Sequence, residues 1–343
     1  MNQSIPQRRS RRSNQDVPPT TTSAPRDPLA DYLMSAACDA SVKQYLNAAL
    51  APNTLNAYAQ DLAHFMAWGG TVPASAEVLA RYVAQHAAKL ATTTISRHLV
   101  AIARAHAAQG LPSPTTSPLV RATLQGVRRS RLHKVRQVAP LLQRDIVAMV
   151  RGLKGVQGIR DTALLLVGFA GAFRRSELVA LDVEDVQWAD EGMILHLRRS
   201  KTDQVGRGRA VAIPAVRGRF CPCRALRRWL EVAKLESGPL FRPLNRYQHV
   251  LGKRLSSQCV AKIIKHRASE IGLDPSVLSG HSLRAGFVTD AAQRGASTTR
   301  IRDQTGHQSD AMLQRYIRNS QLFQNNPNLT IWQTKQSSRR GEG

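Results

Sequence analysis

A basic segment interrupts the apolar pattern of this chain between residues 121 and 136. The segment contains no acidic residue, whereas apolar residues at helical spacing occur on both sides of it. A run of this charge stays in water, so its position between two apolar-patterned regions indicates a linker. At 343 residues the chain is also long enough for two domains. We therefore expect two folded domains joined by a basic linker over residues 127–138.

The charge balance of the chain predicts a polyanionic partner. The sequence has 49 Lys and Arg against 23 Asp and Glu, a formal net charge of +26. An excess spread this widely favours double-stranded DNA, with an anionic membrane surface as a distant second. No apolar run reaches the roughly 18 residues of a membrane span, and the N-terminus lacks a signal-peptide core. The four cysteines form no disulfide framework, so we expect a cytoplasmic, nucleoid-associated protein with no membrane partner.

The N-terminal third of the chain contains two kinds of sequence. Residues 1–35 are rich in Arg, Ser, Thr, Pro and Gln, which predicts a disordered basic arm. Such an arm either improves solubility or contacts DNA. Residues 36–126 instead have the pattern of a compact domain of four or five helices. Helix starts are predicted at Asn53, Ser75, Thr92 or Thr93, and Ser117.

One face of this helical domain is predicted to be basic. The helix that begins near Thr92 directs Ile95, Leu99 and Ile102 inward and leaves its basic residues on the other face. A generic bundle with a solvated face is the alternative, but the net charge favours DNA contact. The linker likewise either follows the phosphates of a duplex or is only solvated. The candidate DNA-binding residues are Arg97, His98, Arg104, Arg121, Arg128, Arg129 and Arg131.

A second domain is predicted over residues 139–320, with a C-terminal tail over residues 321–343. Within it, residues 162–173 are apolar nearly all round, which predicts a buried helix that ends next to Arg174. A buried Arg needs an anion or a carboxylate, and Glu177, three residues further on, can supply one. The adjacent second arginine is expected to point outward.

An antiparallel hairpin is predicted after this helix. Residues 193–198 alternate as a strand, and residues 210–213 form the returning strand. Lys201 lies near the tip, where a Lys is ordinarily just solvated. The Cys-Pro-Cys sequence at 221–223 is predicted to start a helix, because no second cysteine cluster lies at zinc spacing. Ser257 is predicted to cap another helix.

The segment over residues 280–318 carries four side chains that bind anionic oxygen or react at phosphorus. His281 and Arg284 are three residues apart and share one face of a helix. A glycine before His307 indicates a helix end, and Tyr316 is predicted on a short helix beyond it. Each of these residues alone is more often a packing or surface residue, so only their combination suggests a site. The inward face of the short helix is predicted to hold Met312, Leu313 and Ile317.

Together these residues offer charge stabilisation, a general acid and a nucleophile. Two arginines and two histidines can neutralise a phosphodiester as it becomes pentacoordinate, which removes the need for a metal ion. A tyrosine can form a covalent phosphodiester, and a lysine can protonate the leaving sugar oxygen. We therefore expect reversible DNA strand transfer with no metal, ATP or other cofactor. The candidate catalytic residues are Arg174, Lys201, His281, Arg284, His307 and Tyr316, supported by Glu177.

These motifs, in this order and spacing, resemble the tyrosine recombinase (phage integrase) family. The matching features are R-x-S-E-L at 174–178, the hairpin lysine, H-x-x-R at 281–284, and G-H with a Tyr nine residues later. The resemblance extends over about residues 41–319, and the H-S-x-R and Y-I-R-N strings are similar to the Cre-like branch. Two positions depart from the family pattern. Ala285 stands where His is common, and Gly-Ala-Phe at 171–173 stands where T-G-L is common.

The resemblance implies a mostly α fold with a small antiparallel β-sheet in an α+β catalytic domain. It also implies an N-terminal, SAM-like core-binding domain, which forms a C-shaped clamp on DNA with the catalytic domain. Tyr316 would be the nucleophile of a 3′-phosphotyrosine intermediate that leaves a free 5′-hydroxyl, and Lys201 would be the general acid. The four remaining catalytic candidates would bind and activate the phosphate. Family members work as a homotetramer on two DNA sites through a Holliday junction.

The apolar residues of the C-terminal tail allow two interpretations. Family members often pass a C-terminal helix to a neighbouring copy, which would assign the segment over residues 322–332. Packing on its own domain is the alternative. Two other functions are compatible with parts of the sequence, namely a type IB-like topoisomerase and a non-catalytic DNA-binding architectural protein. The apolar tail argues against the first, and the complete set of catalytic candidates argues against the second.

Overall fold

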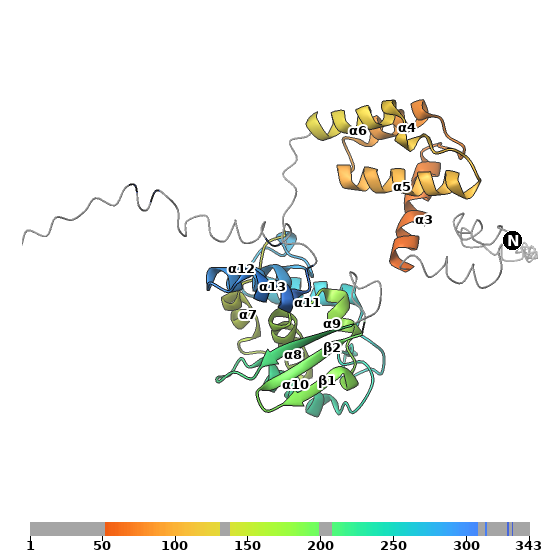
Figure 1. Ribbon diagram of the computed structural model, residues 1–343. Coiled ribbons are helices and arrows are strands. Elements are labelled where there is room, and N and C mark those ends of the chain that lie inside the picture. Colours follow the sequence, from red (N-terminus) through yellow and green to blue (C-terminus); the bar gives the residue numbers. More distant parts are fainter. Residues whose placement is uncertain are drawn as a thin grey trace, which may run out of the picture. The chain divides into compact units, whose positions relative to one another are not determined.

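The computed structural model of this chain describes residues 52–130, 138–198 and 208–307, together with Leu313, Asn328 and Ile331. The chain divides into two compact units between Lys134 and Val135, within the segment predicted as a linker. In Figure 1 the described part of the N-terminal unit is helical, and the C-terminal unit combines helices with a sheet. Several predicted features lie outside the described residues, namely the arm over residues 1–35, Arg131, Lys201, Met312, Tyr316, Ile317 and most of the tail.

Four α-helices make up the described part of the N-terminal unit. They are α3 (Pro52–Ala67), α4 (Ala76–His86), α5 (Thr92–Ala108) and α6 (Pro118–Ser130), with the short 3-10 helix η1 (Pro114–Thr116) before α6. Each α-helix contributes buried side chains to one core, among them Phe65, Leu79, Ile102 and Val120. Ser75 caps α4 by accepting from the Val78 N–H, as its position in the sequence predicted. These amphipathic helices are therefore held together mainly by their apolar faces.

The last of these helices continues past the predicted domain boundary. The expected domain ended at Gly126, but α6 continues to Ser130. Val127 explains the difference, because its side chain is 9% exposed and packs into the core of the N-terminal unit. The basic residues Arg128 and Arg129 thus lie on the last turn of a helix, where cations interact favourably with the helix dipole.

The prediction that His98 lies on the exposed basic face of α5 is wrong. Its side chain is 4% exposed, with Nδ1 2.6 Å from the Tyr82 hydroxyl and Nε2 3.1 Å from Asp61 Oδ1. Burial lowers the pKa of His98 and raises the pKa of Tyr82 to about 12. Asp61 also accepts two hydrogen bonds from Arg97. This polar network connects α5 with α3 and α4, so His98 is a structural residue in this fold.

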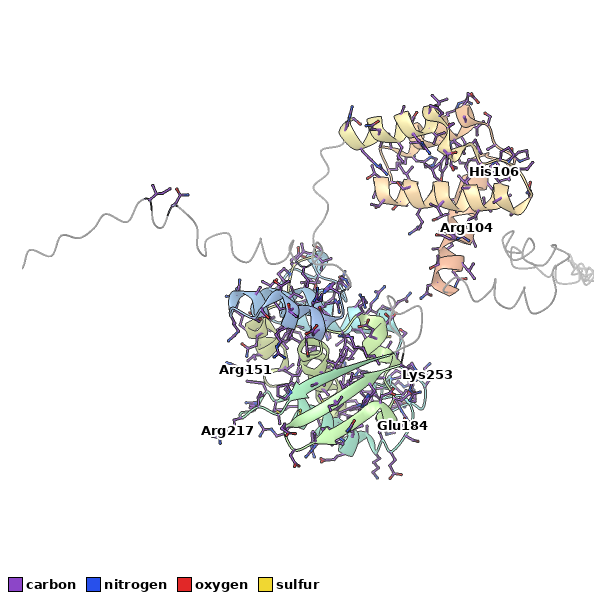
Figure 2. All side chains as sticks on the ribbon, in the orientation of Figure 1. Arg104, His106, Arg151, Glu184, Arg217 and Lys253 are labelled. Atoms are coloured by element: carbon purple, nitrogen blue, oxygen red, sulfur yellow. The ribbon has the colours of Figure 1, made fainter. Side chains whose placement is uncertain are left out.

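The other basic candidates of the N-terminal unit are exposed where the structure describes them. Arg97 is half-exposed although it binds Asp61, and Arg104, Arg121 and Arg128 are exposed. Figure 2 shows Arg104 on α5, where its guanidinium lies 5.4 Å from the centre of the Tyr58 ring on α3. Exposure leaves these side chains available to phosphate, and DNA binding by them stays a prediction.

One buried helix organises the C-terminal unit. It is α8 (Gly155–Ala170), and it packs against α7 (Gln143–Val150), α10 (Pro222–Ala233) and α12 (Ser282–Gln293), as Figure 1 shows. Every residue from Ala163 to Val167 is buried. This confirms the buried helix that the sequence predicted, because a helix that is apolar all round needs partners on every side. The helix ends at Ala170 and not next to Arg174, however, because Ala172 adopts a left-handed conformation with a φ of 48°.

The sheet of this unit has three antiparallel strands in the order β1-β2-β3. They are β1 (Val186–Ala189), β2 (Gly192–Leu197) and β3 (Arg209–Pro214). The two predicted strands correspond to β2 and β3, and Leu197 pairs with Arg209 where the hairpin leaves the sheet. The four-residue strand β1 was not predicted, because so short a segment shows little alternation of its own.

The described part of this unit also contains the α-helices α9 (Arg175–Ala180), α11 (Ser257–Glu270) and α13 (Thr298–Thr305), and the short 3-10 helices η2 (Val183–Asp185) and η3 (Pro275–Val277). Pro222 occupies the first turn of α10, as the Cys-Pro-Cys sequence predicted. The cap of α11 is Ser256 rather than Ser257, because the Ser256 hydroxyl accepts from the Cys259 N–H at 3.2 Å. Leu313 is fully buried against α12 and α13, which confirms its predicted inward direction. None of the helices in the described ranges is long and apolar enough to cross a membrane.

Candidate phosphate-binding site

The first arginine of the site lies between α8 and α9. Arg174 is the N-cap residue of α9, and its side chain is 14% exposed. The buried Glu177 carboxylate accepts from Arg174 Nη1 at 2.5 Å and from the Arg174 backbone N–H at 2.9 Å. As predicted, Glu177 holds Arg174, and Arg175 is exposed. A carboxylate that binds both the backbone and the guanidinium of one residue restricts the direction of that side chain.

A tight connection before Arg174 directs a backbone carbonyl toward the second arginine. Ala172 has a φ of 48°, a left-handed conformation that glycine adopts more easily than alanine. Its carbonyl oxygen accepts from Arg284 Nη1 at 2.8 Å. Arg284 lies on α12 and is 2% exposed. This bond connects the two segments that carry the predicted phosphate-binding arginines.

Two histidines lie next to these arginines at the ends of helices. His281 is the N-cap residue of α12, immediately before the helix that carries Arg284. His307 follows Gly306, which ends α13 with a φ of 65°. The His307 side chain is 8% exposed, and its Nδ1 lies 2.7 Å from the Thr305 hydroxyl oxygen. The structure thus brings together four of the six predicted catalytic residues.

The assembled side chains make this part of the unit strongly cationic. Burial, followed by the charges of Arg284 and Arg174, lowers the pKa of His281. The same causes, in the same order, lower the pKa of His307 to about 3. Both imidazoles are therefore neutral at pH 7 in the DNA-free protein. An anion bound among these groups would offset the arginine charges and raise both histidine pKa values.

Arg209 is a member of this cluster that the sequence analysis did not identify. Its charge contributes to lowering the pKa of His307, and its Nη2 lies 3.8 Å from Glu177 Oε2. A signal was present in the sequence, because alternation along β3 puts Arg209 on the same face as Val211 and Ile213, which are both buried. An arginine on the inward face of a strand requires a specific acceptor.

Two predicted catalytic residues lie outside the described residues, and their roles stay predictions. Lys201 belongs to the connection between the end of β2 at Leu197 and the start of β3 at Arg209. Tyr316 follows His307 by nine residues. The nucleophile and the general acid would thus come from segments adjoining described parts of the site.

The chemistry of the described site suits an oxyanion. A carboxylate holds the partly buried guanidinium of Arg174, a carbonyl holds the buried guanidinium of Arg284, and neutral imidazoles lie beside them. A guanidinium group can bind two oxygens of a phosphate at once. Its electrostatic attraction for the phosphate is strongest when the pair is shielded from water. Within the described ranges, no group of three or more His, Cys, Asp or Glu could hold a metal ion. The described side chains thus form a cationic cluster whose chemistry is suited to an oxyanion such as a phosphodiester.

The chain belongs to the phage integrase family, the site-specific tyrosine recombinases, and the sequence pattern of that family matches residues 141–322. An integrase/recombinase XerD homolog of Selenomonas ruminantium is 39% identical over 295 residues, which are 83% of this chain and 86% of that protein. Recombinase Cre of Escherichia phage P1 is 26% identical over 253 residues, 67% of this chain and 71% of that protein. The resemblance read from the motifs is confirmed by these matches.

Solved structures of the same fold confirm the predicted fold class. The XerH site-specific recombinase bound to difH in a pre-cleavage complex aligns with a TM-score of 0.59 at 14% identity, over 87% of each chain. A lambda integrase tetramer bound to a Holliday junction aligns with a TM-score of 0.58 at 16% identity, over 84% of this chain and 76% of that chain. The mostly helical fold with a small antiparallel sheet is common to them and to this chain.

Proposed function

We propose that this chain cuts DNA at specific sites and rejoins it through a covalent 3′-phosphotyrosine at Tyr316. Arg174 and Arg284 bind the nonbridging oxygens of the scissile phosphate, and His281 and His307 hydrogen-bond to it. Lys201 protonates the departing 5′-oxygen. The protein–DNA bond conserves the energy of the phosphodiester, so rejoining needs no ATP. The arginine charges stabilise the transition state, so no metal ion is needed.

The observation that carries this proposal is that one short backbone segment positions both arginines. Arg284 binds the carbonyl of Ala172, two residues before Arg174, while Glu177 holds Arg174 itself. Two guanidiniums fixed in one frame can bind the developing charge of a pentacoordinate phosphate without reorganising. A protein that only binds the DNA backbone would gain little from burying its arginines in this way.

Trapping of the covalent intermediate tests the proposal. Full-length protein is incubated with a nicked target duplex from which the released 5′ fragment diffuses away, so that protein–DNA adducts accumulate. We expect adducts with the wild-type chain in the presence of EDTA, and none with Tyr316→Phe. Tyr247→Phe is the matched control, because Tyr247 is 65% exposed on the same unit. Adducts at wild-type level in Tyr316→Phe would reject this nucleophile, and loss of cleavage in EDTA would reject the metal-free mechanism.

Assembly on DNA is the second part of the proposal. The C-terminal unit has an apolar groove of about 500 Å³, lined by residues that include Val147, Leu166, Phe169, Phe287 and Ile301. We assign its occupant as the apolar tail of a neighbouring copy in a DNA-bound tetramer. Ile331, which belongs to this tail, is 69% exposed in the single copy, so its apolar surface lacks cover there. The tetramer on a Holliday junction formed by lambda integrase supports the same assembly for this chain.

Removal of the tail separates assembly from chemistry. We expect a chain shortened to residues 1–320 to form adducts on a single site but to lose the pairing of two sites. Native gel electrophoresis with one-site and two-site DNA measures both properties. Equal loss of adducts and of thermal stability would show instead that the tail packs on its own domain.

The cellular setting follows from the same chemistry. We propose that the protein works in the cytoplasm on the nucleoid, because its net charge of +26 favours a DNA partner. A fluorescent fusion that coincides with DNA stain is the expected result. A fusion that spreads evenly through the cell, or that follows the cell envelope, would contradict it.

A further inference from the structure

Arg209 is the first residue of β3, the strand that follows the connection containing Lys201. Its side chain binds α13, the helix that precedes His307. Its side chain is 19% exposed, and Nη1 donates to the Gln304 carbonyl at 2.5 Å and to the Asp303 carbonyl at 3.4 Å. These carbonyls belong to the last turn of α13, where helix carbonyls lack partners within the helix. Arg209 therefore fixes the last turn of α13 at Gln304, three residues before His307.

The other nitrogen of the same guanidinium faces the carboxylate that holds Arg174. Nη2 is buried, has no hydrogen-bond partner among the described residues, and lies 3.8 Å from Glu177 Oε2. Glu177 uses Oε1 for the Arg174 guanidinium and Oε2 for the Arg174 backbone N–H. Arg209 thus neutralises the side of Glu177 that the Arg174 guanidinium does not occupy, at a separation where a unit charge is still strongly felt in a dry interior.

Gly306 provides the space for this contact. A Cβ atom at this position would lie 2.9 Å from Arg209 Nε and 3.0 Å from its Cζ. Gly306 also has a φ of 65°, which ends α13 and turns the chain toward His307. The glycine before His307 therefore serves the helix end and the approach of the guanidinium together.

We propose that Arg209 is a positioning residue for strand cleavage. It holds the hairpin strand, the His307 segment and the Arg174–Glu177 pair in one geometry. This inference rests on the proposed function of the site. Arg209 itself does not touch the DNA in this role, and its effect on the reaction passes through Glu177 and His307.

A second arginine of the same unit provides a matched control. Arg254 donates from Nη1 to the carbonyls of Val179 and Leu181, at 2.7 and 3.0 Å, and its Nη2 pairs with Asp182. Like Arg209, it donates to two backbone carbonyls and lies next to one carboxylate, which it hydrogen-bonds, whereas Arg209 faces Glu177 at 3.8 Å. Its partners include no predicted catalytic residue, so its loss reports the structural cost of such an arginine.

Adduct formation under single-turnover conditions tests the proposal on full-length chains. We expect Arg209→Lys to lower the cleavage rate constant about 10- to 100-fold, because displacement of reacting groups by about 1 Å has an effect of this size. DNA affinity and the unfolding midpoint should match those of Arg254→Lys. A lysine keeps the charge but cannot bind the Gln304 carbonyl and face Glu177 with two separate nitrogens.

A second variant displaces Arg209 without replacing it. Asn tolerates the left-handed conformation, so Gly306→Asn keeps the helix end while its Cβ presses on the Arg209 guanidinium. We expect the same loss of cleavage as in Arg209→Lys. In a double-variant cycle, Arg209→Lys and Glu177→Gln should be strongly non-additive in cleavage rate, whereas Arg254→Lys and Glu177→Gln should be additive.

The outcomes separate the inference from the proposed function. Absence of Tyr316-dependent adducts in the wild-type chain would reject the function of the site, and the inference with it. Wild-type adducts together with equal rates for Arg209→Lys and Arg254→Lys would overturn the positioning role alone. Additivity between positions 209 and 177 would overturn it as well.

Discussion

Arg284 Nη1 donates a hydrogen bond of 2.8 Å to the carbonyl oxygen of Ala172, a residue 112 positions earlier in the chain. The carbonyl points to Arg284 because Ala172 adopts a φ of 48°. Alanine in this left-handed conformation costs roughly 1–2 kcal/mol. This strain accounts for the glycine that is common at this position in the family pattern, from which this chain departs. The alanine takes the conformation that a glycine would adopt more easily.

Ala172→Gly should therefore be tolerated. Relief of the backbone strain offsets the lost methyl group, worth about 0.8 kcal/mol, and the added freedom of the unfolded chain. We expect the free energy of unfolding, measured in urea, to change by less than about 1 kcal/mol, with the cleavage rate unchanged. Ala163→Gly is the control, because Ala163 is equally buried but lies inside α8. It should be clearly more destabilising, and equal losses in the two variants would contradict the strain at Ala172.

Glu177→Gln should impair cleavage far more than DNA binding. The amide keeps the shape of the carboxylate but leaves the half-buried Arg174 without its negative partner. We expect a 10- to 100-fold lower rate of adduct formation, since a misdirected guanidinium stabilises the transition state poorly. Glu184→Gln serves as control, because Glu184, labelled in Figure 2, is exposed and its carboxylate accepts from the Gly238 N–H. A rate in Glu177→Gln as high as in Glu184→Gln would show that Arg174 needs no carboxylate.

The buried histidine makes stability depend on pH in a defined direction. The pKa of His307 is about 3 in the folded chain, against about 6.5 in an unfolded one. Between these values the unfolded state binds a proton that the folded state does not, so stability falls as the pH decreases below about 6.5. We expect His307→Gln to lose less stability than the wild type between pH 7 and pH 5. Thermal unfolding measures this, with the exposed His249→Gln as control. Parallel curves for wild type and His307→Gln would contradict the buried neutral imidazole.

The general-acid role of Lys201 can be tested with a modified leaving group. A 5′-sulfur at the scissile position leaves without needing a proton, whereas a 5′-oxygen needs one. We expect Lys201→Ala to slow cleavage of ordinary DNA by about 100-fold or more and to slow cleavage of the sulfur substrate much less. Lys253→Ala, at the exposed position labelled in Figure 2, should affect neither. Equal slowing on both substrates would assign Lys201 another role.

In the N-terminal unit, Arg104 and His98 should behave differently. Arg104 is exposed, so we expect Arg104→Ala to weaken DNA binding and to reduce the slope of log affinity against log salt by about 0.9. His98 is buried between Tyr82 and Asp61. His98→Gln should lower the unfolding midpoint and leave the salt slope unchanged. Fluorescence anisotropy over a salt series measures the slopes, and a reduced slope in His98→Gln would return His98 to the DNA surface.

Much of the fold could be predicted from local pattern. The buried helix α8 was evident because residues 163–167 are apolar on every side, and the hairpin was evident from two alternating strands. The pairing of Arg174 with Glu177 was also predictable, because both residues lie within one helical turn. The prediction for His98 was wrong, because helical periodicity alone does not distinguish an exposed histidine from a buried one that interacts with an aspartate and a tyrosine.

The sequence by itself determined the chemical groups of the site and their order along the chain, because residue type and spacing set which groups can share a helical turn. Only the tertiary structure decided that Arg284 binds the Ala172 carbonyl and that Arg209 faces Glu177. Those contacts join residues on separate elements, and their partners are backbone carbonyls or charges far away in the chain. Burial also lowers the pKa of His307. This shift cannot be read from a local motif, because the burial results from several elements that pack around the histidine.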